Sequence, residues 1–439
     1  METSVTSVLS QPELLACIIA NHFHRYEAFR LRCVNKAFAS CIDYLAASVP
    51  NLAGSVSSPW RSRCLVALAR DTRVVDLTDL VLPLRLTSPD TASGSGLTQC
   101  RSAQLSVRLR GRKRRSSSAW LTSLALNKLN HTLYVCDYEA QGLTLLSATS
   151  LGKRSRLQQV QEDPEGVVAT ATHVYVQSSY GALACCCLAT GAVLCNKELP
   201  ESVLGGEPIT WALKQGPDGA LYATADRPYE ARIYTEPPPG VTGCVLRWQL
   251  DAQGLPCSCA PYTDTVLRRP CGLDWGPLCG SLFVTSMDAC LMRFAGPSHP
   301  SPGSLLAVIQ LAEPPTAGPS QGPCLAHASP GATLAVHKPW QQSVVGGSSA
   351  GAVTALPPGM LPWDVAVVRG STLLVTLHRH KNKAIPKPCR RLGSRGQHSL
   401  PAAEAGYVAV LPELGTAGHM RVVRLPDAWD HANMLCVDE

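Results

Sequence analysis

Two short cysteine clusters are the residues whose type most directly suggests chemistry. Cys185, Cys186 and Cys187 are consecutive, and Cys257 and Cys259 are separated by one residue. Structural zinc requires four convergent ligands, with the cysteines usually in more widely spaced pairs. Neither cluster has that spacing, and neighbouring side chains of a strand point to opposite faces of the sheet, so the three consecutive cysteines do not converge on one point. We interpret these cysteines as small buried side chains and predict no metal site and no cofactor.

Arginine is the residue type here that could recognise an acidic or phosphorylated protein segment. Its planar guanidinium pairs two oxygens of a phosphate or carboxylate at once. Binding residues concentrate on loops that a rigid scaffold holds. The candidates stand at or near expected strand ends and are Arg227, Arg268, Arg269 and Arg379. We predict them as substrate-binding residues; the alternative is that they are exposed arginines that only keep the surface soluble.

Composition limits the class of protein. The chain has 439 residues, of which 45% are hydrophobic and 16% charged, so it can bury a core and form more than one domain. No apolar run approaches the length of a membrane span, and no signal segment is expected at the N-terminus. The 19 cysteines are therefore expected to be reduced, in a protein of the cytoplasm, with the nucleus as a second location. The net charge of +7 is concentrated in local clusters, which does not favour a nucleic-acid partner.

From residue 119 the sequence changes to short apolar strands separated by glycine and proline turns. One unit recurs: an apolar strand, a turn, and a strand of the Leu-Tyr-Val type. The six copies span residues 122–135, 166–183, 210–224, 272–285, 323–336 and 362–376. Their starts lie roughly 40–60 residues apart, which is the range of propeller blades.

Each unit must bury both faces of its sheet, so it needs a similar neighbour on either side, and a closed ring satisfies every copy. The chain is therefore predicted to be mainly β, with a six-bladed β-propeller over residues 119–439. A strand at Gln104–Leu109 is expected to close the ring. The third and fourth copies, with Gly216-Pro217-Asp218-Gly219 and Gly272-Leu273-Asp274-Trp275, resemble the NHL and gluconolactonase-type propellers.

That resemblance implies a second interpretation. Gluconolactonase-type propellers hold a divalent metal in the central channel through Glu, Asn and Asp. The acidic residues available here are Glu165, Glu207, Asp226, Asp274 and Asp364, with Glu207 most similar to the glutamate ligand. No matching asparagine can be placed, so the alternative is that these carboxylates occupy turns and rim loops.

Residues 1–49 are predicted to form a small three-helix unit. Ser10 and Glu13 form a capping box at the start of the first helix, and Pro12 fits its first turn. Leu14 and Ile18 lie on one apolar helix face together with Leu15 and Ile19.

The same segment resembles the F-box. The matching residues are Pro12-Glu13-Leu14-Leu15, Ile18, Leu31-Arg32, Val34, Lys36 and Phe38. Two positions depart from the family: Gln11 replaces the usual leucine, and His24-Arg25-Tyr26 stands where an Asp-Leu pair is common. The resemblance implies docking on a Skp-type adaptor of a cullin–RING ubiquitin ligase. The residues it assigns to that interface are Pro12, Glu13, Leu14, Leu15, Ile18, Leu31, Val34 and Lys36. The alternative is a helical hairpin that only packs on the next domain.

Residues 50–118 are predicted to be a connector, partly flexible, with a short helix expected over residues 61–71. Its basic end, residues 108–115, is either a nuclear-import signal, a phosphorylation-tuned switch or a solvated loop.

Together these features predict a non-enzymatic substrate-recognition adaptor of an SCF-type ubiquitin ligase, whose propeller binds an unknown protein substrate. The alternatives are a lactonase-like propeller hydrolase with a helical extension, and a scaffold with another partner.

Overall fold

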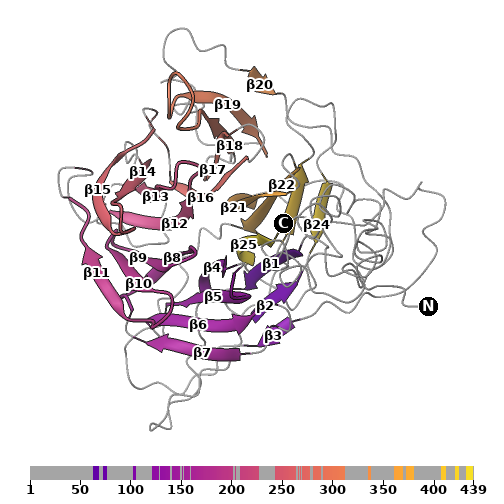
Figure 1. Cartoon of the computed structure of the whole chain (residues 1–439). Helices are drawn as coiled ribbons and strands as arrows, with labels where there is room; N and C mark the ends of the chain where they lie inside the picture. Colours follow the sequence, from indigo (N-terminus) through magenta and orange to yellow (C-terminus); the bar gives the residue numbers. More distant parts are fainter. Residues whose placement is uncertain are drawn as a thin grey trace, which may run out of the picture.

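A computed structural model describes the strands of a β-propeller (Figure 1). The described residues are 63–68, 73–76, 102–104, most of 121–311, 335–337, 360–368, 372–379, 407–411, 421–424 and 432–438; within 121–311 the largest gap is 227–242. They form 25 strands in six sheets. The F-box-like unit predicted for residues 1–49 lies outside the described residues. Within the described part of the chain, no helix is long and apolar enough to cross a membrane.

Five sheets are blades built from consecutive strands. Blade 1 contains β4 (Leu121–Asn127), β5 (Thr132–Asp137), β6 (Gly142–Ser147) and β7 (Lys153–Gln158). Blade 2 contains β8 (Pro164–Ala169), β9 (His173–Ser178), β10 (Leu183–Cys187) and β11 (Val193–Lys197). Blade 3 contains β12 (Ile209–Gln215), β13 (Leu221–Asp226), β14 (Gly243–Leu250) and β15 (Pro256–Pro261). Blade 4 contains β16 (Pro270–Trp275), β17 (Leu282–Ser286), β18 (Cys290–Phe294), β19 (Leu305–Gln310) and β20 (Ala335–His337). Blade 5 contains β21 (Met360–Val368), β22 (Thr372–Arg379), β23 (Tyr407–Leu411) and β24 (Arg421–Arg424).

The sixth sheet joins the two ends of the described chain. It has the order β25-β1-β2-β3, with β25 (Ala432–Asp438), β1 (Arg63–Leu68), β2 (Arg73–Asp76) and β3 (Ser102–Gln104). The pairing of β25 with β1 is antiparallel and begins at Arg63 opposite Asp438. We call this the closing sheet, because β25 contacts both β4 of blade 1 and β21 of blade 5.

The innermost strands β4, β8, β12, β16, β21 and β25 contact one another in that order, and β25 returns to β4, so the ring is closed (Figure 1). The mainly β fold and the propeller are thus as predicted. The prediction that six repeats form six blades is wrong, because only five of the repeats form blades among the described residues. The described end of the fifth repeat, β20, adds to blade 4 as a strand parallel to β19. One strand cannot form a blade of its own.

Two predictions for the connector also need correction. The helix expected over residues 61–71 is wrong, because residues 63–68 form β1, with Cys64 and Leu65 buried. A short apolar run is compatible with either a helix face or a buried strand. Here residues 63–68 form a strand because they pair with the edge of β25. Ring closure uses β25 in place of Gln104–Leu109, of which only Gln104 is described, at the end of β3.

The core is divided among the interfaces between neighbouring blades. Between blades 2 and 3, for example, Tyr175 and Val168 pack with Leu213 and Trp248. Similar apolar clusters join blades 3 and 4, and blades 4 and 5. Because each blade is buried on both faces, its strands need few polar positions, which explains the near-continuous apolar runs.

Candidate functional site

The innermost strand of every blade has a β-bulge near its start. In blade 3 the register shifts between Thr210 and Leu213, and in blade 4 between Pro270 and Leu273. The other blades shift at corresponding positions. A bulge adds a residue to one strand and redirects its side chains. We call this end of the ring the bulge mouth.

Threonine hydroxyls replace the hydrogen bonds that the bulges remove from three blades. The acceptors are Thr224, Thr285 and Thr376, whose Oγ1 atoms accept from the amides of Ala212, Gly272 and Asp364 at 3.2, 2.8 and 3.0 Å. The Thr224 hydroxyl also donates to the Cys271 carbonyl of blade 4. The Thr285 hydroxyl donates to the Trp363 carbonyl of blade 5 at 2.8 Å. Thr224 and Thr285 therefore both repair a bulge and join neighbouring blades.

A cluster of charged and aromatic side chains, buried except for the partly exposed Trp363, lies at the bulge mouth between blades 3, 4 and 5. The Trp211 Nε1–H donates to Asp226 Oδ2 at 3.3 Å, and the Arg269 guanidinium lies 5.4 Å from the centre of the Trp211 ring. Trp363 meets Trp211 edge-on, with ring centres 5.5 Å apart. Asp226 and Arg269 are 0% and 2% exposed. We call Trp211, Asp226, Arg269 and Trp363 the bulge-mouth cluster.

Burial controls the protonation of the cluster. It raises the pKa of Asp226 to about 7, although the Trp211 hydrogen bond and the Arg269 charge both act to lower it. Asp226 Oδ1 has no hydrogen-bond partner among the described residues. Asp226 is therefore a buried carboxyl whose proton is lost near neutral pH.

The acidic residues considered for a metal do not gather in the described part of the structure. No three His, Cys, Asp or Glu side chains there could hold an ion together. Asp274 instead joins blades, because its Oδ2 accepts from the Val367 amide at 2.8 Å. Burial raises the pKa of Glu165, and Glu207 lies outside the described residues.

Of the four predicted substrate-binding arginines, the structure describes the backbone of Arg269 and Arg379 and the side-chain contacts of Arg269. Arg269 is buried against Trp211. Arg379 is the last residue of β22, opposite Met360 at the start of β21. Arg227 and Arg268 lie outside the described residues, next to Asp226 and Arg269. The residues predicted to bind the Skp-type adaptor, Pro12 through Lys36, also lie outside them.

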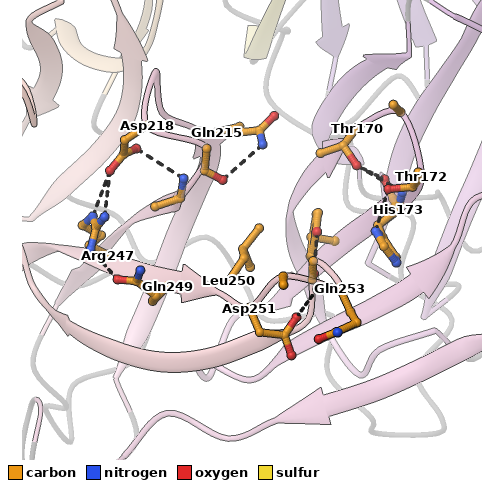
Figure 2. A pocket seen from close by; sticks show the side chains of 16 residues that line it. Thr170, Thr172, His173, Gln215, Asp218, Arg247, Gln249, Leu250, Asp251 and Gln253 are labelled. Carbon is orange, nitrogen blue, oxygen red and sulfur yellow. Dashed lines mark hydrogen bonds and ion pairs between the residues drawn. The ribbon is translucent and has the colours of Figure 1, made fainter.

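A polar groove lies between blades 2 and 3 at the opposite mouth of the ring (Figure 2). Its volume is about 420 Å³. It is lined by the turn of residues 170–173 between β8 and β9, by residues 215–220 between β12 and β13, and by residues 247–254 around the end of β14. We call it the blade 2–3 groove.

One wall of the groove is a charged network on blade 3. Arg247 contacts Asp218 Oδ2 through Nη2 at 2.8 Å and Nε at 3.1 Å, and its Nη1 donates to Gln249 at 2.9 Å. The Tyr222 hydroxyl donates to the same Asp218 oxygen at 2.9 Å. Burial is the main reason that the pKa of Tyr222 is raised, so the phenol stays protonated. The network holds the Gly216–Gly219 turn in place.

The other wall brings blade 2 against the last turn of blade 3. The Tyr175 hydroxyl donates to the Gly254 carbonyl at 2.7 Å, and His173 Nδ1 lies 2.8 Å from Thr172 Oγ1. Gly254 has φ of +82°, and a Cβ there would lie 3.0 Å from the His173 ring, so glycine suits this position. The groove offers amide, hydroxyl, carboxylate and imidazole groups to a polar ligand.

The sequence indicates Asp226 and Arg269 as separate candidates, but it predicts neither the bulge-mouth cluster nor the blade 2–3 groove. Gly216-Pro217-Asp218-Gly219 indicates a repeat that resembles the NHL and gluconolactonase-type propellers, and a turn carboxylate followed by Arg247 is the signal for an ion pair across two strands. Trp211 and Trp363 fall in the third and sixth repeats, and the sequence does not predict that they lie together. Their meeting depends on blade order around the ring.

Comparison with known proteins adds only fold likeness. No protein-family model and no curated protein matches the chain. A chain of a nidogen–laminin complex is 11% identical, covers 86% of this chain and 98% of its own, and has a TM-score of 0.48. A gluconolactonase from Xanthomonas campestris is 16% identical, covers 70% of this chain and 86% of its own, and has a TM-score of 0.37. A functionally unknown protein from Desulfotomaculum acetoxidans is 12% identical, covers 82% and 77%, and has a TM-score of 0.40. Likenesses at these identities and scores carry no information about function.

Proposed function

We propose that the protein is a substrate-recognition adaptor of an SCF-type cullin–RING ubiquitin ligase. The observation that carries the proposal is the ordered F-box-like pattern from Pro12 to Phe38, followed in the same chain by a propeller. In this arrangement one segment docks on the ligase while a rigid scaffold presents a substrate.

The F-box-like segment supplies the docking surface in this proposal. Ser10, Pro12 and Glu13 begin a helix at a defined residue. Leu14, Leu15, Ile18, Leu31 and Val34 provide apolar side chains, and Lys36 a charge, to the three-helix unit and its adaptor interface. Sequence does not divide these residues between packing and binding.

The propeller supplies the substrate-binding surface. Hydrogen bonds such as Thr285 to Trp363 join the blades, so turns and edges keep fixed relative positions. A protein of this kind performs no bond-making chemistry. It raises the effective concentration of substrate lysines near the ligase, and therefore the rate of ubiquitin transfer.

The test is capture of a Skp-type adaptor by the full-length chain. The double variant Leu14→Ala/Leu15→Ala should lose at least about tenfold in capture, because truncating buried leucines costs about 2–5 kcal/mol each. The matched control is Val193→Ala/Leu194→Ala, which removes two exposed apolar side chains from the propeller. Failure of the wild-type chain to capture the adaptor, or equal capture by both variants, would contradict the proposal.

A further inference from the structure

The outer strand of blade 2 differs from the outer strands of the other sheets. An outer strand presents unpaired backbone groups, which proteins usually protect with charges, prolines, β-bulges, shortness or a covering segment. In the other sheets, the sequences of β7 and β24 contain basic residues, β15 begins and ends with proline, β3 has three residues, and β20 covers the edge of β19. β11, with the sequence Val-Leu-Cys-Asn-Lys, shares a register shift against its neighbour with β7 and β15, but it has one charge, at its end, no proline and no covering strand among the described residues.

β11 is also exposed and apolar. Val193 and Leu194 are 47% and 48% exposed, and they are two of only four large hydrophobic residues so exposed within the described chain. β10 is the single strand that pairs with β11 there, so the far edge of β11 carries no described strand (Figure 1).

The register identifies which backbone groups face outward. Leu188 N donates to the Thr172 carbonyl on the inner side of blade 2, and Cys187 N donates to the Ala192 carbonyl on the outer side. Because backbone groups alternate in direction along a strand, the N–H and C=O of Cys185 point toward its partner Cys195 on β11. Asn196, next along β11, must then present both its N–H and its C=O to the open edge.

Blade 4 provides a precedent in the same chain. β20 adds to the outer edge of β19 in parallel, with Ala335, Val336 and His337 opposite Ala307, Val308 and Ile309. The outer edge of a blade in this protein therefore accepts an additional extended segment through main-chain hydrogen bonds.

We propose that the open edge of β11 binds an extended peptide of a partner protein as a fifth strand of blade 2. Uncharged residues with apolar side chains suit the positions beside Val193 and Leu194. A second copy of the chain is a poorer occupant, because a five-residue edge is only roughly 17 Å long and buries too little surface for a stable dimer. That the peptide belongs to a ubiquitination substrate rests on the proposed function, whereas its binding to β11 does not.

The decisive variant removes one backbone donor. Asn196→Pro deletes the outward N–H without removing a hydrogen bond to β10, and proline is tolerated on an edge strand. Asn196→Ala is the matched control, because it removes the side chain and keeps the N–H. Circular dichroism and the unfolding midpoint establish that both variants are folded.

The probe is a phage-displayed library of randomised linear peptides selected on the full-length protein without any adaptor present. Enriched peptides should bind Asn196→Pro roughly tenfold more weakly than wild type, and bind Asn196→Ala within roughly twofold of wild type. Val193→Ser/Leu194→Ser should weaken binding as well.

Three results would overturn the inference. The first is the absence of any enriched peptide, and the second is equal binding to wild type and the proline variant. The third is slow hydrogen exchange of the Asn196 amide in the free protein, because it would show that another part of this chain or a second copy already covers the edge. Adaptor capture by Asn196→Pro should equal that of wild type. Failure of the peptide experiment is therefore distinguishable from failure of the adaptor proposal.

Discussion

Asp226 shows how one residue can connect packing to pH. It is the last residue of β13, where the chain leaves the blade at the bulge mouth, and it is fully buried. Its carboxylate accepts from Trp211 and is attracted by Arg269, yet burial is the larger effect and raises its pKa to about 7. Arg269 and Trp211 therefore only partly offset the cost of burying its negative charge.

The free energy of unfolding should therefore fall with rising pH because of Asp226. Its pKa is about 7 in the folded protein and about 3.9 when unfolded, so the folded state binds more protons between these values. The stability that protonated Asp226 contributes is fully present below about pH 4 and is lost as pH rises toward about 7, by at most about 1.4 kcal/mol per pH unit.

The measurement is urea unfolding of wild type and Asp226→Asn at several pH values between about 5 and 8. The wild type should lose stability relative to the asparagine variant up to about pH 7, and the difference should then level off. Glu162→Gln, at an exposed position, is the control and should follow the wild type. Parallel profiles for wild type and Asp226→Asn would show that burial does not raise this pKa.

At the scale of elements, ring closure depends on a single strand. β25 pairs with β1 and also contacts β4 and β21, so it connects the first and last blades of the chain. Residues 63 and 438 are thereby brought into one ladder across nearly the full length of the protein. A closed ring has no exposed inner edge, which is the main structural reason for placing a strand there.

Removing residues 432–439 should open the ring. We expect the midpoint of thermal unfolding to fall by at least about 10 °C, because the truncation exposes the inner faces of blades 1 and 5. A peptide of residues 430–439 added in trans should restore part of the loss, and a scrambled peptide should not. An unchanged midpoint in the truncated chain would show that β25 does not close the ring.

At the scale of the whole molecule, the described cysteines are spread through the sheets. Eleven described cysteines carry free thiols, most of them buried. Cys185 and Cys195 lie directly opposite each other on β10 and β11, and burial raises the pKa of Cys185 to about 12. A thiol with so high a pKa reacts slowly with oxidants, because the thiolate is the reactive form.

We expect nearly all 19 cysteines to be free in the native protein. Alkylation under denaturing, non-reducing conditions followed by intact mass measurement counts them directly. Several defined disulfides would place the protein in an oxidising compartment and weaken the adaptor proposal. The Cys185–Cys195 pair is the first to examine, since these two cysteines lie directly opposite each other on paired strands.

Local sequence patterns were sufficient to predict most of the blades. An apolar strand, a turn and a second strand, as in Thr210–Thr224 and Gly272–Thr285, are features of neighbouring residues, and their repetition implies stacked sheets. The F-box-like segment is likewise a pattern of adjacent residues, and it stays a prediction because it lies outside the described structure.

The features that the sequence could not predict all depend on residues far apart in the chain. Residues 63–68 form a strand because β25 offers them a partner, and Arg269 is buried because blade order brings Trp211 beside it. β20 joins blade 4 for the same reason, since an open edge was available. Periodicity reports which face of a segment is apolar, but the choice of partner is a property of the assembled ring.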